Sequence, residues 1–322
     1  MHDVCDDVGV THVRNNRVVV IGEALVDLVM PEAAPIEAVL GGAPYNTARA
    51  LARLGVGVDF CGTVSVDRFG ERIMTQLTAD GVGTGLVERC EQPTTLAAAE
   101  LSSKGSADYR FYIDGTSAPR LERDRLDDMP TWVFTGGLGL VLEPMASRVD
   151  DIMSALGAGT RVMVDVNVRP KVISDLTGYR RRVERVAARC DIVKVSDEDL
   201  AHLYPDVDAE TGVQRLLECG AALVLVTAGG DAVVARTAND RIVVSIPPAV
   251  IVDTIGAGDT FDAGVLAYWC EIPAEMVDPT DAVQIAAAVD LGARAARVVV
   301  GRRGADPPRR SELPPADEPR DR

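Results

Sequence analysis

The sequence predicts an α/β fold: a three-layer α/β/α sandwich with a mostly parallel central sheet and a small additional β-sheet. Short β-branched segments alternate with longer amphipathic ones along most of the 322 residues, which is typical of strand–helix repeats. Most of the apolar segments lack strict alternation, as expected for strands covered by helices on both faces. Two segments in the N-terminal third resemble strands with no helix after them, which predicts the additional sheet.

The strands of the large sheet are expected at 17–22, 58–64, 131–136, 161–167, 191–196 and 222–227. The helices are expected at 46–54, 68–80, 147–156, 179–189, 209–219, 260–270 and 281–297. Several of these segments end before Gly or Pro, which are common stop signals. Parallel sheets of this kind bind ligands beyond the carboxyl ends of their strands, so functional residues are expected there.

Residues 25–40 and 94–117 interrupt the repeat and are expected to form a β lid over one end of the sheet. An ordinary surface hairpin is the alternative for 94–117. Residues 1–16 lack periodicity, and residues 306–322 are rich in Pro and mixed charge. Both ends are therefore expected to be disordered, which leaves a single domain over 17–305.

Composition excludes several classes of function. A net charge of −16 makes a nucleic-acid or anionic-membrane surface unfavourable, so neither partner is expected. No apolar stretch is long enough to span a membrane, and the polar N-terminus does not resemble a secretory signal. The six scattered cysteines suggest thiols in a reducing compartment, and a cytoplasmic protein is expected. No lysine follows Gly and precedes Ser or Thr, which excludes a P-loop.

The stretch VDTIGAGDTFDAG (252–264) combines small residues with a carboxylate at the start of an expected helix. The first turn of a helix has unpaired N–H groups and a partial positive charge, and small residues let an anion approach them. Asp259 at that position could accept a proton from an attacking hydroxyl. Together these features indicate phosphoryl transfer. An ordinary helix cap is the structural alternative.

Two motifs resemble signatures of the PfkB, or ribokinase-like, family of carbohydrate kinases. One is DTIGAGDTFDAG (253–264), and the other is GGAPYNTARALARLG (41–55). The resemblance extends over roughly 17–305 and implies a ribokinase-like sandwich with a β lid, ATP as the phosphoryl donor and Mg²⁺. It implies that Asp259 is the base and that Gly256, Ala257 and Gly258 form the anion hole.

Further site residues follow from matches to the family's pattern. The sugar-binding positions implied are Asp27, Gly41, Gly42, Asn46 and Arg169. The nucleotide-binding positions implied are Lys194, Thr227, Gly229, Gly256 and Gly258. Asp199 is a candidate for Mg²⁺, in a shortened form of the family's Asn-x-x-Glu, and Asp253 is a candidate for a monovalent cation such as K⁺. Family dimers pair through their lids, so a homodimer of this kind is a further expectation.

Within the family, the combination of GEALVDL, FYIDGTSA, DVNVRP and VKVSDEDL is most similar to fructokinases, which phosphorylate D-fructose to fructose 6-phosphate. A 2-keto-3-deoxygluconate kinase, a ribokinase and a nucleoside kinase remain alternatives. A sugar acid would need a cation near the lid, where Asp114 stands instead, although Arg110 is close in sequence. Outside this class, a non-catalytic sugar- or nucleotide-binding regulator is the competing hypothesis.

Overall fold

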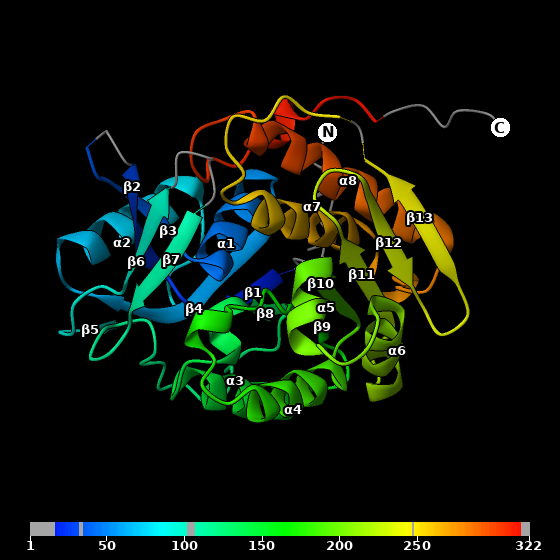
Figure 1. Cartoon of the computed structure of the whole chain (residues 1–322), viewed down its shortest axis with the longest axis horizontal. Coiled ribbons are helices and arrows are strands. Elements are labelled where there is room, and N and C mark those ends of the chain that lie inside the picture. Colours follow the sequence, from blue (N-terminus) through cyan, green and yellow to red (C-terminus); the bar gives the residue numbers. More distant parts are fainter. Residues whose placement is uncertain (1–16, 32–34, 102–106, 247, 317–322) are drawn as a thin grey trace, which may run out of the picture.

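A large sheet forms the centre of the protein (Figure 1). The computed structural model describes residues 17–31, 35–101, 107–246 and 248–316. Within them, a nine-stranded sheet runs in the order β13-β12-β11-β10-β9-β8-β1-β4-β5. Its strands are β1 (Arg17–Ile21), β4 (Gly57–Ser65), β5 (Val87–Cys90), β8 (Trp132–Gly136), β9 (Arg161–Asp165), β10 (Ile192–Ser196), β11 (Leu223–Thr227), β12 (Ala232–Arg236) and β13 (Arg241–Ser245). All pairings from β5 to β11 are parallel, and those of β12 with β11 and β13 are antiparallel.

Helices cover both faces of this sheet (Figure 1). The helices of one face are α1 (Ala43–Arg53), α2 (Arg68–Asp80), α7 (Ala257–Glu271) and α8 (Ala282–Val300). Those of the other face are α3 (Met145–Ala155), α4 (Leu176–Ala187), α5 (Asp197–Leu203) and α6 (Ala209–Cys219). Short 3₁₀ turns occur at Gly137–Leu140, Pro170–Val172, Ala274–Met276 and Arg310–Glu312.

Strand β1 shows why the apolar segments do not alternate with polar ones. Val18 and Val20 pack in the core beneath α1 and α7, whereas Val19 and Ile21 pack in the core beneath α3 and α4. All four side chains are at most 1% exposed. A central strand buried on both faces needs apolar residues at every position, so the predicted α/β/α sandwich is confirmed.

A separate four-stranded sheet lies at one end of the sandwich (Figure 1). Its strand order is β3 (Glu37–Gly41), β2 (Leu25–Pro31), β6 (Leu96–Leu101) and β7 (Ala107–Tyr112). The hairpin β6–β7 pairs edge-on with β2, which is parallel to β6. The two segments that interrupt the strand–helix repeat therefore combine in one small sheet, which the following sections call the lid.

Some elements were not predicted from the sequence. Strands β5, β12 and β13 and the short helix α5 extend the expected pattern, and GLGL after β8 is a 3₁₀ turn. The expectation of a disordered tail is wrong for residues 306–316, because this segment is tied to the domain: Arg53 pairs with Asp306 at 2.6 Å, and Pro307 and Pro308 are buried. Residues 1–16 and 317–322 lie outside the described residues. No helix in the described part is both long and apolar enough to cross a bilayer.

Candidate active site

Asp259 lies in the first turn of α7, at the carboxyl ends of the parallel strands. The Asn46 amide of α1 donates to its Oδ2 at 2.9 Å, although the two residues are 213 positions apart. Burial raises the pKa of Asp259 to about 6, and the nearby Asp165 adds to the rise, while Asn46, Arg169 and Lys194 oppose it. A carboxylate with this pKa is ionised at neutral pH and is basic enough to take a proton.

The turn before Asp259 presents free backbone donors. Gly256 has a φ of +77°, a conformation that favours glycine, and it caps the helix without a side-chain bond. Within the described residues, the amides of Gly256, Gly258 and Asp259 donate to no carbonyl or carboxylate. The amide of Ala257 donates to Thr254 O at 3.2 Å, so this member of the predicted anion hole is already occupied. The three remaining donors can hold an anion at the positive end of the helix.

A cavity of about 360 Å³ opens beside Asp259, between the lid and the large sheet. It contains four of the five residues predicted for the sugar side: Asp27, Gly42, Asn46 and Arg169. The fifth, Gly41, lies behind Asp27, where a methyl group would overlap the Asp27 carboxylate. Leu25, Tyr109, Phe111 and Leu138 supply the apolar part of the wall. The predicted residues are thus brought together from the lid, α1 and the loop after β9.

Glu23 is a cavity residue that the sequence analysis did not identify. Its side chain is 3% exposed, Oε1 accepts the Ala43 amide at 3.2 Å, and Oε2 has no partner among the described residues. Burial raises the pKa of Glu23 to about 8, so the group is mostly protonated at neutral pH. A protonated carboxyl can donate as well as accept a hydrogen bond. The motif GEALVDL (22–28) contained the residue, but only Asp27 was singled out from it.

The cavity carries more acids than bases. Four carboxyl groups, those of Glu23, Asp27, Asp165 and Asp259, line it together with Arg169 and Lys194. Burial raises the pKa of Asp27 to about 7, and the charge of Asp259 adds to the rise. Hydroxyl groups, which donate to carboxylates and accept from protonated carboxyl groups, complement such a wall.

Lys194 stands between this cavity and a second one. Its Nζ donates to Asp165 Oδ2 at 3.0 Å, and its side chain is 7% exposed. Burial alone would lower the pKa of Lys194, but the charges of Asp165, Asp262 and Asp199 outweigh it and raise the pKa. The ammonium group is therefore a permanent positive charge close to Gly258, where a hypothetical Cβ would lie 3.5 Å from Nζ.

The second cavity, of about 330 Å³, is mostly apolar. It contains the predicted nucleotide-side residues Thr227 and Gly229. Ile246, Ala249, Ile251, Phe261, Ala293, Ala296 and Val300 form most of its remaining wall. Lys194, Thr254 and Gly258 line both cavities, so the two meet at the N-terminus of α7. This meeting point is where a group could pass from one ligand to the other.

The two predicted metal residues have other contacts. Asp199 Oδ1 accepts the Val168 amide at 2.7 Å and Oδ2 accepts the Ser196 amide at 2.8 Å, as part of a capping box on α5. These amides hold both oxygens of Asp199 in place, and its role toward Mg²⁺ stays a prediction. In the described part of the chain no three His, Cys, Asp or Glu side chains come together as a metal site.

Asp253 likewise accepts two amides, from Ile255 at 3.0 Å and from Gly304 at 2.8 Å. It fixes the loop before α7, and a role in binding a monovalent cation stays a prediction.

Asp114 does not lie where it could repel a sugar acid bound beside Asp259. Asp114 and Arg110 are exposed and line a third cavity, on the far side of Tyr109 and Phe111 from Asp259. Neither residue lines the cavity beside Asp259 within the described residues. A ligand in that cavity would instead meet the carboxyl groups around Asp259 together with Arg169 and Lys194.

Comparisons with known proteins agree with this geometry. The chain matches the pfkB family carbohydrate kinases over residues 15–312. This chain belongs to that family. A fructokinase of Rhizobium leguminosarum bv. trifolii is 33% identical over 253 residues, which cover 76% of this chain and 77% of the relative.

Two solved structures are similar to this pfkB kinase over most of its length. Fructokinase from Vibrio cholerae O395, in a form with fructose, ADP and potassium ion bound, has a TM-score of 0.81 at 26% identity, covering 90% of this chain and 94% of that one. Aminoimidazole riboside kinase from Salmonella enterica, complexed with aminoimidazole riboside and an ATP analogue, has a TM-score of 0.75 at 26% identity, covering 90% and 95%. The family thus makes this chain an ATP-dependent carbohydrate kinase with fructokinases among its relatives.

Proposed function

We propose that this pfkB kinase transfers the γ-phosphoryl group of ATP to a primary hydroxyl of a neutral sugar, D-fructose, giving fructose 6-phosphate. The observation that carries the proposal is the position of Asp259, which lines the acid-lined cavity next to Gly258, a residue that lines both cavities. The similarity to several fructokinases supports fructose as the sugar.

The sugar occupies the cavity between lid and sheet. Asp27 and the side-chain oxygen of Asn46 accept hydrogen bonds from its hydroxyl groups, and protonated Glu23 donates one to them. The primary hydroxyl lies next to Asp259, which takes its proton as the oxygen attacks phosphorus. Because Asn46 also holds Asp259, sugar binding and orientation of the base share one side chain.

The triphosphate reaches the same point from the apolar cavity. The amides of Gly256, Gly258 and Asp259 hold the charge that develops on the transferred group, and Lys194 adds a positive charge beside them. Mg²⁺ enters as the MgATP complex, held mainly by the phosphates and water, which suits an ion that usually keeps several waters. A monovalent cation at the loop of Asp253 and a homodimer formed through the lid are retained as proposals.

A second candidate is a riboside kinase. Tyr109 and Phe111 stack with ring centroids 6.1 Å apart and line both the sugar cavity and the third cavity, of about 830 Å³. An aromatic pair at that place could hold the base of a riboside.

The test is ADP release in a coupled assay with each acceptor in turn: fructose, ribose, 2-keto-3-deoxygluconate, adenosine and aminoimidazole riboside. We expect fructose to give the highest kcat/KM and the product to be the 6-phosphate. Preference for a riboside would select the second candidate. ADP release that no acceptor increases, with sugar binding intact, would favour the non-catalytic regulator. The Asp259→Asn variant, purified in parallel, controls for contaminating kinases.

A further inference from the structure

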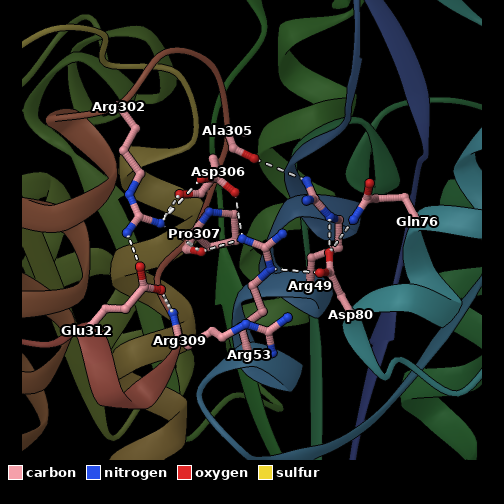
Figure 2. A network of polar contacts seen from close by, with 10 residues as sticks. All are labelled: Arg49, Arg53, Gln76, Asp80, Arg302, Ala305, Asp306, Pro307, Arg309 and Glu312. Carbon is pink, nitrogen blue, oxygen red and sulfur yellow. Dashed lines mark hydrogen bonds and ion pairs between the residues drawn. The ribbon is translucent and has the colours of Figure 1, made fainter.

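We propose that a buried ion cluster on α1 and α2 positions the phosphate-binding turn by holding the C-terminal segment against it. The cluster consists of Arg49, Arg53 and Asp80, and the segment, residues 304–307, is called the strap. Figure 2 shows the cluster and the strap side by side. The inference rests on the proposed function, because it assigns positioning residues to that reaction.

The cluster is a closed set of ion pairs. Arg49 Nε donates to Asp80 Oδ2 at 2.7 Å, and Arg53 Nε donates to Asp80 Oδ1 at 2.7 Å. Gln76 adds a third hydrogen bond, at 3.0 Å, and the Asp80 side chain is only 2% exposed. Buried charges are costly unless they are fully bonded, and here one bond from each arginine and one from Gln76 satisfy the single carboxylate. The cluster therefore holds both guanidinium groups in fixed orientations.

Both guanidinium groups hold the strap with their remaining donors (Figure 2). Arg49 Nη1 donates to Ala305 O at 3.1 Å. Arg53 Nη1 donates to Asp306 Oδ1 at 2.6 Å and to Pro307 O at 2.7 Å. Two backbone carbonyls and one carboxylate of the strap are thus tied to helix α1.

The strap in turn supports the loop that carries the free amides. Gly304 N donates to Asp253 Oδ2 at 2.8 Å, and the other oxygen of Asp253 holds the Ile255 amide. A methyl group added at Gly256 would lie 2.8 Å from the Cβ of Ala305, so the turn rests directly on the strap. A shift of the strap would therefore move the donors of Gly256 and Gly258.

Helix α1 also holds the base. Asn46, Arg49 and Arg53 are three and four residues apart, which places them along one face of the helix. Asn46 bonds the Asp259 carboxylate at 2.9 Å, while the two arginines fix the turn through the strap. One rigid element thus sets the position of the base relative to the amide donors. Errors of about 1 Å in such an arrangement can cost on the order of 10²-fold in rate.

The test compares Arg53→Met and Asp306→Ala with Arg294→Met. Arg294 pairs with Asp290 and donates to Pro314 O at 2.9 Å, so it also holds the C-terminal segment. Because Pro314 lies outside the strap, Arg294→Met is the matched control. We expect kcat to fall roughly 10-fold in Arg53→Met and about 3-fold in Asp306→Ala. The KM for the sugar should stay within about 2-fold, and Arg294→Met should keep the wild-type kcat.

A double variant, Arg53→Met with Asp306→Ala, should have a kcat close to that of Arg53→Met alone, since both changes break the pair of Arg53 with Asp306 and only the longer pair of Arg302 with Asp306, at 3.3 Å, is lost in addition. If Arg53→Met does not fold, the kcat of Asp306→Ala tests the inference by itself. The Asp306 side chain is 51% exposed, so its removal leaves the core intact. Wild-type kcat in Asp306→Ala, or an equal loss in Arg294→Met, would overturn the inference. An inactive wild type would instead overturn the proposed function.

Discussion

The two cavities that meet at α7 are similar in volume and opposite in chemistry. The cavity under the lid is lined by four carboxyl groups, and each one of them has its place fixed by a strand end, a helix or the lid. The nucleotide-side cavity is lined mainly by aliphatic side chains, and its rim includes Ile251, which is 66% exposed. Under the proposed function, specificity for the acceptor depends on directional groups, whereas the non-phosphate part of the donor is held mainly by apolar contact.

The largest effect on turnover should come from changing Asp259, next to the residues that line both cavities. Asp259→Asn removes the base but leaves both walls intact, so we expect kcat to fall roughly 10³-fold, in the range attributed to a general base. The melting temperature should not decrease, because burial raises the pKa of Asp259 and its charge is therefore unfavourable in the folded state. Steady-state kinetics and thermal unfolding measure the two effects, and turnover near that of the wild type would contradict the assignment.

A change confined to the sugar side should separate the two cavities. In Gly41→Ala the new methyl group overlaps the Asp27 carboxylate, so kcat/KM for the sugar should fall about 10²-fold. The affinity for ATP, measured by calorimetry, should stay within about 2-fold. Gly85→Ala is the matched control, since nothing lies within 4 Å of a methyl group there. Equal losses for sugar and ATP would mean that the cavities are not independent.

The reverse change is Ile251→Asp, which places a negative charge on the apolar rim. We expect the KM for ATP to rise about 10-fold, because a carboxylate repels the phosphates and is poorly solvated beside aliphatic groups. The KM for the sugar should not change. Val283→Asp serves as the control, as another exposed apolar residue (76% exposed) that does not line the cavity. A similar rise in both variants would mean that the charge acts at long range.

The smallest expected effect concerns Glu23. Its pKa of about 8 means that the carboxyl loses its proton, and gains a charge beside three other acids, as the pH rises above 8. In the wild type kcat/KM for the sugar should therefore decrease by several-fold between about pH 7 and 9. Glu23→Gln keeps a neutral donor and should show no such decrease. Identical profiles for the two proteins would exclude Glu23 from sugar binding.

Local patterns in the sequence account for most of the fold. Strand–helix alternation and uninterrupted β-branched segments predicted six strands, and helices α2 and α6 begin and end at the predicted residues. Strands β12 and β13 were missed because each predicted strand was expected to be followed by a helix, whereas this hairpin turns back along the sheet edge. Helix α5 has only seven residues, and its capping box, Ser196 with Asp199, was interpreted as a metal motif.

Site residues could be predicted from the sequence only where they belong to a recognisable motif. The sequence pointed to Asp259, Asn46 and Asp27 individually, but the bond between Asn46 and Asp259 joins residues far apart in the chain. Glu23 and the ion cluster of α1 have no local signal, since their roles depend on which groups the fold buries around them. The tail after residue 305 looked disordered by composition, yet Arg49 and Arg53 of α1 provide partners that composition cannot reveal.

The pH dependence of kcat/KM for fructose tests most directly whether an ionised Asp259 drives the reaction. Because its pKa is about 6, we expect the rate to fall below pH 6, approaching tenfold per pH unit, and to level off toward pH 7, below the range in which Glu23 loses its proton. The fall should persist in Asp27→Asn and be absent from the residual activity of Asp259→Asn. A wild-type profile that stays flat down to about pH 5, or a fall that survives in Asp259→Asn, would contradict the account.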